Sequence, residues 1–223
     1  MNARYTAAFL SLVFAITAKS QTTNDTIKDI GNKLSGGETS VSEILSNKSY
    51  MQLHSLTPFR QVIKQNATTR KINLVTDAEP GTRITVSGIV MNVSGKPLTD
   101  KLIYLYQTSS EGWYSDTAAH INQNEGDRRH ARIFGYLRTD TAGKFSFTTV
   151  KPKGYPHSDL PAHIHIEIEL NKNKSFISEL LFEDDPRLTG EIRTRSIKEN
   201  FLIAKNSNTK DPPLYTYLIH ISN

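Results

Sequence analysis

The chain has 223 residues, 37% of them hydrophobic and 9% aromatic, which is enough to bury the core of one ordinary domain with an extension. Its formal net charge of +5 is spread along the sequence and gives no case for nucleic-acid binding. The absence of cysteine excludes disulfides, zinc thiolate sites and thiol nucleophiles. Any bound metal must therefore take nitrogen and oxygen ligands.

The first twenty residues have the pattern of a secretory signal peptide. Arg4 supplies a positive charge before an apolar run at residues 7–16, and Ala18 and Ser20 are small residues placed for cleavage before Gln21. The alternative is an uncleaved membrane anchor, but the run is shorter than the roughly 20 residues needed to cross a bilayer. We expect an exported chain, periplasmic or extracellular, with no stable membrane insertion.

Residues 21–81 are expected to form a mostly irregular N-terminal arm or linker that packs on the following domain. Gly36 and Gly37 and many Ser, Thr and Asn residues indicate loose structure. Ser40 followed by Glu43 predicts one short helix that begins with a capping box. Nothing in this segment suggests chemistry.

Residues 82–223 carry the signals of an all-β domain, which we expect to be an antiparallel β-sandwich. Short alternating segments rich in β-formers are separated by turn residues, and helical periodicity is confined to a short stretch around 197–204. The expected strands are residues 83–90, 102–106, 133–138, 145–150, 163–170, 176–182 and 214–221.

The strand at 163–170 carries two candidate metal ligands. Because side chains alternate across a strand, His163 and His165 share one face, roughly 7 Å apart at the backbone. The apolar residues share the other face: Ile164, Ile166, Ile168 and Leu170. Two imidazoles at this spacing can converge on one ion, although the same pattern also fits the solvated face of an amphipathic strand.

Several motifs in a fixed order favour the metal site. They are Gly112-Trp113-Tyr114, the Thr-Asp-x-x-Gly-x-Phe of Thr139–Phe145, the Lys-Pro-x-x-Tyr-Pro of Lys151–Pro156, Pro161-Ala162-His163-Ile164-His165, and Leu181–Pro186. In this order and spacing, the sequence from about Thr82 to Ile221 resembles the intradiol ring-cleavage dioxygenases, especially the protocatechuate type.

The resemblance implies a non-haem Fe(III) site, one per chain, in an enzyme that cleaves a catechol-type aromatic ring with dioxygen. By motif, the ligands would be two phenolates and two imidazoles: Tyr114, Tyr155, His163 and His165. Tyr155 would be the phenolate that a bound catechol displaces, and it would then act as a base. Phenolate oxygens are hard anionic donors, which suit a ferric ion.

Two positions expected to contribute to catalysis depart from the family pattern. Leu160 stands where the family has an arginine, and Glu179 where it has a glutamine. The lost cation could cost roughly 3–4 kcal/mol of transition-state stabilisation, so we expect a neutral or apolar catechol, turned over slowly. Arg128, Arg129 or Arg132, in the loop between the two tyrosines, could replace the missing cation. Trp113 is a candidate wall of the pocket.

Two alternatives remain open. Transthyretin-like sandwiches of exported proteins share the turn patterns and act as binding or spacer modules, in which case the four ligand residues would be coincidental. A member of the family could also bind iron without cleaving a ring. The sequence does not indicate an oligomeric state.

The signal-peptide pattern predicts a mature chain that begins at or near Gln21. N-terminal sequencing of exported protein checks this expectation. An intact Met1 on that protein would refute it.

Overall fold

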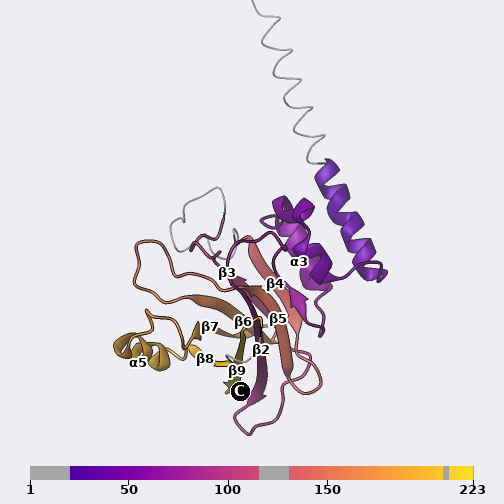
Figure 1. Ribbon diagram of the computed structural model, residues 1–223. Helices are drawn as coiled ribbons and strands as arrows, with labels where there is room; N and C mark the ends of the chain where they lie inside the picture. The colour runs from indigo at the N-terminus through magenta and orange to yellow at the C-terminus, as the bar shows by residue number, and fades with distance from the viewer. Residues whose placement is uncertain (1–20, 116–130, 208–210, 223) are drawn as a thin grey trace, which may run out of the picture.

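The computed structural model describes residues 21–115, 131–207 and 211–222 (Figure 1). The predicted signal segment, Arg128 and Arg129 lie outside these ranges. Residues 21–35 are helical. The elements that follow are α2 (Val41–Ser46), η1 (Lys48–Leu53), α3 (Thr57–Gln65), β1 (Ile72–Asn73), β2 (Arg83–Asn92), β3 (Leu102–Gln107), β4 (Ile133–Arg138), β5 (Lys144–Val150), β6 (His163–Asn171), β7 (Lys174–Phe182), α5 (Gly190–Lys198), β8 (Leu202–Ser207) and β9 (Leu214–Ile221).

All seven strands expected from the sequence are present, and each differs from its expected range by two residues or fewer at either end. The sequence did not predict β1 and β8. It also placed the short helix wrongly: α5 ends at Lys198, and β8 begins at Leu202 inside the expected segment. Short apolar runs such as Phe201–Ile203 do not distinguish a strand from a helix by periodicity alone.

The strands form one mixed sheet in the order β1-β5-β2-β9-β8-β7-β6-β3-β4. The expected antiparallel sandwich is therefore only partly right, because β1 pairs with β5, β2 with β9, and β7 with β8 in parallel. Alternation shows which face of a strand is buried but does not identify its neighbour in the sheet.

Strand β8 joins the two halves of this sheet. Its first residues pair with β7 and its last residues pair with β9. A single core lies between the halves, with Val86 of β2, Leu105 of β3 and Ile166 of β6 all buried in it. The ends of β3, β5 and β6 are thereby fixed relative to one another, and these ends carry the candidate site.

The N-terminal arm is helical, which corrects the expectation of mostly irregular structure. The capping box at Ser40 and Glu43 is present as predicted and begins α2. The apolar residues Leu45 and Phe59 are fully buried in the same core as the strands. Figure 1 shows α3 beside β4, with α5 on the opposite side beyond β7 and β8. No helix in the described ranges is long and apolar enough to cross a membrane.

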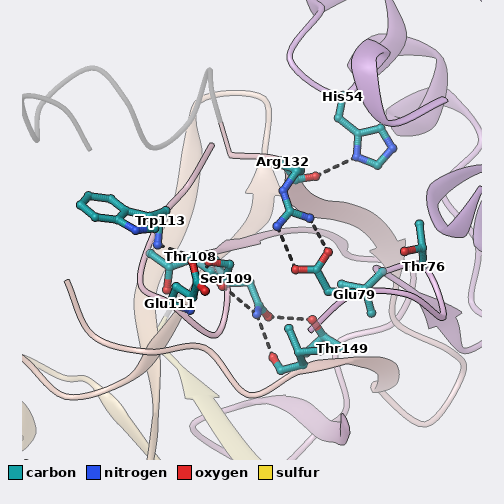
Figure 2. Close-up of polar contacts among 12 residues, drawn as sticks. His54, Thr76, Glu79, Thr108, Ser109, Glu111, Trp113, Arg132 and Thr149 are labelled. Atoms are coloured by element: carbon teal, nitrogen blue, oxygen red, sulfur yellow. Dashed lines mark hydrogen bonds and ion pairs between the residues drawn. The ribbon is translucent and has the colours of Figure 1, made fainter. Parts of the chain in front are cut away.

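Buried polar contacts attach this arm to the end of the sheet that carries the site. His54 Nδ1 lies 2.7 Å from the carbonyl oxygen of Arg132, and the guanidinium of Arg132 binds the buried carboxylate of Glu79, with one N–O distance of 2.8 Å (Figure 2). Arg60 of α3 donates to the Ala131 carbonyl at 2.6 Å. Residues just before β4 are thus held by side chains from the arm.

Burial lowers the pKa of His54 from 6.5 to about 4, and the nearby guanidinium groups act in the same direction. As pH falls below 6.5, the unfolded chain takes up a proton that folded His54 accepts only near pH 4. We therefore expect this histidine to remove about 3 kcal/mol of stability between pH 7 and pH 4.

Urea unfolding of the wild type and of His54→Asn at both pH values measures this contribution. The asparagine amide can still donate to the Arg132 carbonyl but does not titrate, so the variant should lose about 3 kcal/mol less on acidification. Equal losses in the two proteins would contradict the assignment to His54.

Candidate metal centre

The centre starts at the first residues of β6. The alternation expected from the sequence is confirmed, with Ile164 and Ile166 buried on the core face. His163 and His165 lie on the other face with ring centroids 4.9 Å apart. Pairing with β3 and β7 fixes this segment on both sides, so the two imidazoles stand on a rigid part of the sheet.

The two tyrosines come from loops that follow β3 and β5. Tyr114 lies seven residues after β3 ends at Gln107, and Tyr155 lies five residues after β5 ends at Val150. The buried side chain of Gln107 ties the two strand ends together, because its amide donates to the Val150 carbonyl at 2.9 Å and its oxygen accepts from Thr149. Both loops therefore start from one anchored point.

Gly112 lets these two loops touch, and Gly154 lets the second loop fold back on its own Leu160. Gly112 has φ +92°, and a Cβ atom there would lie 2.6 Å from the carbonyl oxygen of Gly154. A Cβ atom on Gly154 would lie 2.0 Å from the carbonyl oxygen of Leu160. Only glycine permits this approach without displacing main-chain atoms. The loops are also hydrogen-bonded, with the Thr108 hydroxyl donating to the Lys153 carbonyl at 2.7 Å.

The structure brings the four predicted ligand atoms together. Tyr114 Oη lies 2.7 Å from Tyr155 Oη and 2.8 Å from His165 Nε2. Tyr155 Oη lies 3.2 Å from His163 Nε2 and 3.4 Å from His165 Nε2. Donors bound about 2.0–2.1 Å from one ion lie about 2.8–3.4 Å from their neighbours in octahedral or tetrahedral geometry, and the four distances fall in this range or within 0.1 Å of it. The spacing thus fits two oxygens and two nitrogens around one metal.

Neighbouring groups orient both imidazoles for coordination. His163 Nδ1 lies 2.9 Å from the carbonyl of Pro161, which can only accept, so Nδ1 carries the proton and Nε2 presents its lone pair towards Tyr155. The ring of His165 stacks on Tyr106 of β3 at a centroid distance of 4.4 Å and an interplanar angle of 9°. The sequence did not indicate this role for Tyr106.

Glu179 is the cross-strand neighbour of His165 on β7. Its carboxylate lies 3.8 Å from Nδ1 of His165, the nitrogen that faces away from the phenols. The donor atoms of Glu179, His163 and His165 all lie within 4.8 Å of one another, so a three-ligand site with this carboxylate is a second arrangement that the cluster allows. Carboxylates commonly face the outer nitrogen of a metal-bound histidine, which favours an orienting role for Glu179.

A cavity of about 240 Å³ opens beside the centre. Tyr155, His163 and Glu179 line one part of it, and α5 with the residue after its end lines another. The complete lining is Tyr155, Leu160, Pro161, His163, Glu179, Leu181, Ile192, Arg195, Ser196, Glu199 and Phe201. Tyr114 is 2% exposed and is not among them, so Tyr155 is the phenol that borders the cavity.

Two sequence-based candidates lie elsewhere. Arg132 is paired with Glu79, and together with Trp113 these residues line a different cavity of about 440 Å³ (Figure 2). Arg132 is therefore not the substitute cation of the 240 Å³ cavity, and Trp113 is not its wall. The arginine that does line that cavity is Arg195. The sequence did not indicate this residue, because α5 carries no recognisable motif and Arg195 is far from Tyr155 along the chain.

Comparisons with known proteins identify relatives of this architecture. A family model described as Dioxygenase matches residues 59–220. The protocatechuate 3,4-dioxygenase beta chain of Burkholderia cepacia is 30% identical over 52% of this chain and 52% of its own length. The chlorocatechol 1,2-dioxygenase of Rhodococcus opacus is 28% identical over 51% of this chain and 48% of its own. The chain thus spans about half the length of these curated relatives.

Solved structures show the same fold. The dioxygenase domain of a dioxygenase and carbohydrate-binding protein fusion from Streptomyces sp. SirexAA-E aligns with a TM-score of 0.54 at 24% identity, covering 70% of this chain and 89% of that one. An intradiol ring-cleavage dioxygenase from Tetranychus urticae aligns with a TM-score of 0.51 at 19% identity, covering 70% and 87%.

The approach of the two tyrosine loops can be tested with a matched pair of glycines. Gly95 has φ +79°, and a Cβ atom added there would meet nothing within 4 Å, so Gly95→Ala adds backbone strain alone, about 1–2 kcal/mol. Gly112→Ala adds the clash with Gly154 as well and should cost about 1–3 kcal/mol more. Urea unfolding gives the difference, and near-ultraviolet circular dichroism should change only for Gly112→Ala. Equal effects of the two substitutions would show that the loops do not depend on this contact.

Proposed function

The chain belongs to the intradiol dioxygenase family, and we propose on this basis that it cleaves a catechol-type ring between its two hydroxylated carbons, incorporating both atoms of dioxygen. The ion would be Fe(III), non-haem, one per chain. Its ligands would be Tyr114, Tyr155, His163 and His165. The observation that carries the proposal is the convergence of these four donor atoms beside a cavity.

The donor set favours ferric iron. Two phenolates are hard, anionic oxygen ligands, and they offset much of a trivalent charge. Free tyrosine has a pKa near 10, so two phenols 2.7 Å apart would both ionise near neutral pH only with a strong cation between them. When bound, iron would draw electron density from a chelating catecholate and make the ring reactive towards dioxygen.

Tyr155 would be the residue that accepts a proton from the substrate. Its hydroxyl borders the cavity, whereas Tyr114 is buried behind it. A catechol entering the cavity would meet Tyr155 Oη first, and a phenolate released there can accept a proton from the catechol hydroxyl. Tyr114 and the two histidines, held by packing and by the Pro161 carbonyl, would keep their positions.

The cavity walls suit a single aromatic ring. Leu160, Leu181 and Phe201 supply apolar surface that would exclude water from the ring. Leu160 lines the cavity but is 38% exposed, and its side chain cannot stabilise negative charge. Glu179 lies beside the imidazole of His165, where its charge would support the ligand rather than the attacked ring. Slow turnover is the expected consequence of these two residues.

We also propose that the mature protein works outside the cytoplasm, because its first residues have the order of a cleavable signal peptide. Its substrate would then be a catechol encountered in the periplasm or in the surroundings of the cell.

Metal analysis and visible spectroscopy of the purified protein test the proposal. Phenolate bound to Fe(III) absorbs visible light, so the protein should be coloured, should contain about one iron per chain and should change colour when a catechol chelates. His163→Ala and His165→Ala should lose most of the iron. Tyr155→Phe and Tyr114→Phe should retain some iron with a shifted absorption band. His220→Ala, an exposed histidine on β9, is the control and should match the wild type.

Two results would decide against the proposal in different ways. A colourless protein that takes up no iron from ferrous salt and air would favour the binding or spacer module. A coloured protein without oxygen uptake would be an iron-binding member without ring cleavage, and Leu160→Arg would then test whether the missing cation is responsible.

A further inference from the structure

The cavity beside the metal centre is lined by a positive side chain, that of Arg195. We propose that Arg195 binds an anionic substituent, such as a carboxylate, on the ring of the catechol. This inference rests on the proposed function and specifies its substrate class. It replaces the expectation of a neutral catechol, which assumed that no cation lines the pocket.

The lining residues near the metal and those of α5 together suggest how a catechol would be oriented in the cavity. Tyr155 and His163 present their polar atoms on the side of the metal centre. Ile192, Arg195 and Ser196 of α5 line the cavity as well. A ring that chelates through its two adjacent hydroxyls points its far edge away from the metal. A substituent on that edge would approach the rest of the lining, which includes the guanidinium of Arg195.

The C-terminal part of α5 is held in place by hydrogen bonds. The amide of Phe201 donates to the Ser196 carbonyl at 2.8 Å, and the hydroxyl of Ser178 on β7 donates to the Asn200 carbonyl at 2.9 Å. Ser196 is 4% exposed, whereas Arg195 beside it is exposed. The cation therefore stands on a fixed element, while its long side chain stays adjustable.

Arg195 is available for a ligand. Within the described ranges its guanidinium forms no hydrogen bond or ion pair. Guanidinium matches a carboxylate in a planar, two-pronged geometry, and such charge-assisted pairs are stronger than neutral hydrogen bonds. Apart from the imidazole of His163, it is the only basic side chain among the described residues that line the cavity.

Two carboxylates, of Glu179 and Glu199, also line the cavity. They could bind a catechol of the opposite charge, one that carries an amine. Glu179 faces the His165 imidazole and is the cross-strand partner of that residue, so its charge is directed to the metal side. Glu199 follows α5 and is exposed, as is Arg195, so solvent screens both charges. The planar guanidinium can still pair with a carboxylate through two parallel hydrogen bonds, which makes its contact the more directional one. The carboxylate-bearing catechol is therefore the better match.

Anaerobic titration of the iron-loaded protein measures binding without turnover. The ligands are plain catechol, 3,4-dihydroxybenzoate and 4-(2-aminoethyl)catechol, each followed by the change in visible absorption. The wild type should prefer the benzoate. In Arg195→Ala, the ratio of the dissociation constants for benzoate and plain catechol should rise about tenfold, which corresponds to about 1.4 kcal/mol. Arg195→Lys should give an intermediate ratio, because lysine keeps the positive charge but cannot form the planar, two-pronged pair with a carboxylate.

Arg193→Ala is the matched control, since it removes the same charge from the same helix at a residue outside the cavity lining, and it should keep the wild-type ratio. The role of Arg195 would be overturned if Arg195→Ala left the ratio of the two dissociation constants unchanged, or if Arg193→Ala raised it equally. The dioxygenase proposal would still stand. A wild-type preference for the amine would do the same. If none of the three catechols binds, both proposals fail.

Discussion

The contact between the two tyrosine loops is the constraint on which the candidate site depends. Tyr114 and Tyr155 are 41 residues apart and follow different strands, yet their hydroxyl oxygens lie 2.7 Å apart. Their loops approach so closely that a Cβ atom on Gly112 would lie 2.6 Å from the carbonyl oxygen of Gly154. The histidines need no such device, because one strand already places them side by side. The sheet thus supplies half of the donor set, and two loops in contact at Gly112 supply the other half.

The N-terminal helices have a defined part in holding this arrangement. The amide of Arg132 donates to the carbonyl of Tyr114 at 2.8 Å, so Arg132 fixes the main chain at one ligand. Its own carbonyl contacts His54, and its guanidinium is paired with Glu79. Both partners belong to the segment that the sequence presented as an arm without chemistry. Breaking such a buried pair by removing one partner typically costs about 3–5 kcal/mol, so the arm contributes to the stability of the region around Tyr114.

Much of this could be predicted from residues close together in the sequence. Alternation identified seven strands and the shared face of His163 and His165, and the ordered motifs identified the two tyrosines. The pairing of β2 with β9 and the helical arm could not be predicted in this way, because they depend on contacts between distant segments. Arg195 was missed for the same reason. It lies 40 residues after Tyr155, and only the folded chain brings both to one cavity.

A cation beside the metal centre could both bind an anionic substrate and stabilise charge in the transition state. Here the two roles would fall to different positions, since residue 160 is a leucine and the cation of the cavity is Arg195. A cation at position 160 would stand in the loop before the ligand strand, close to the ring carbon that reacts. Arg195 stands on α5 and would act on a substituent at the far edge of the ring. A charge there strengthens binding of substrate and transition state alike, and uniform binding of this kind lowers KM without raising kcat. If Arg195 binds substrate as we propose, the cavity would select an anionic catechol more effectively than it would accelerate its cleavage.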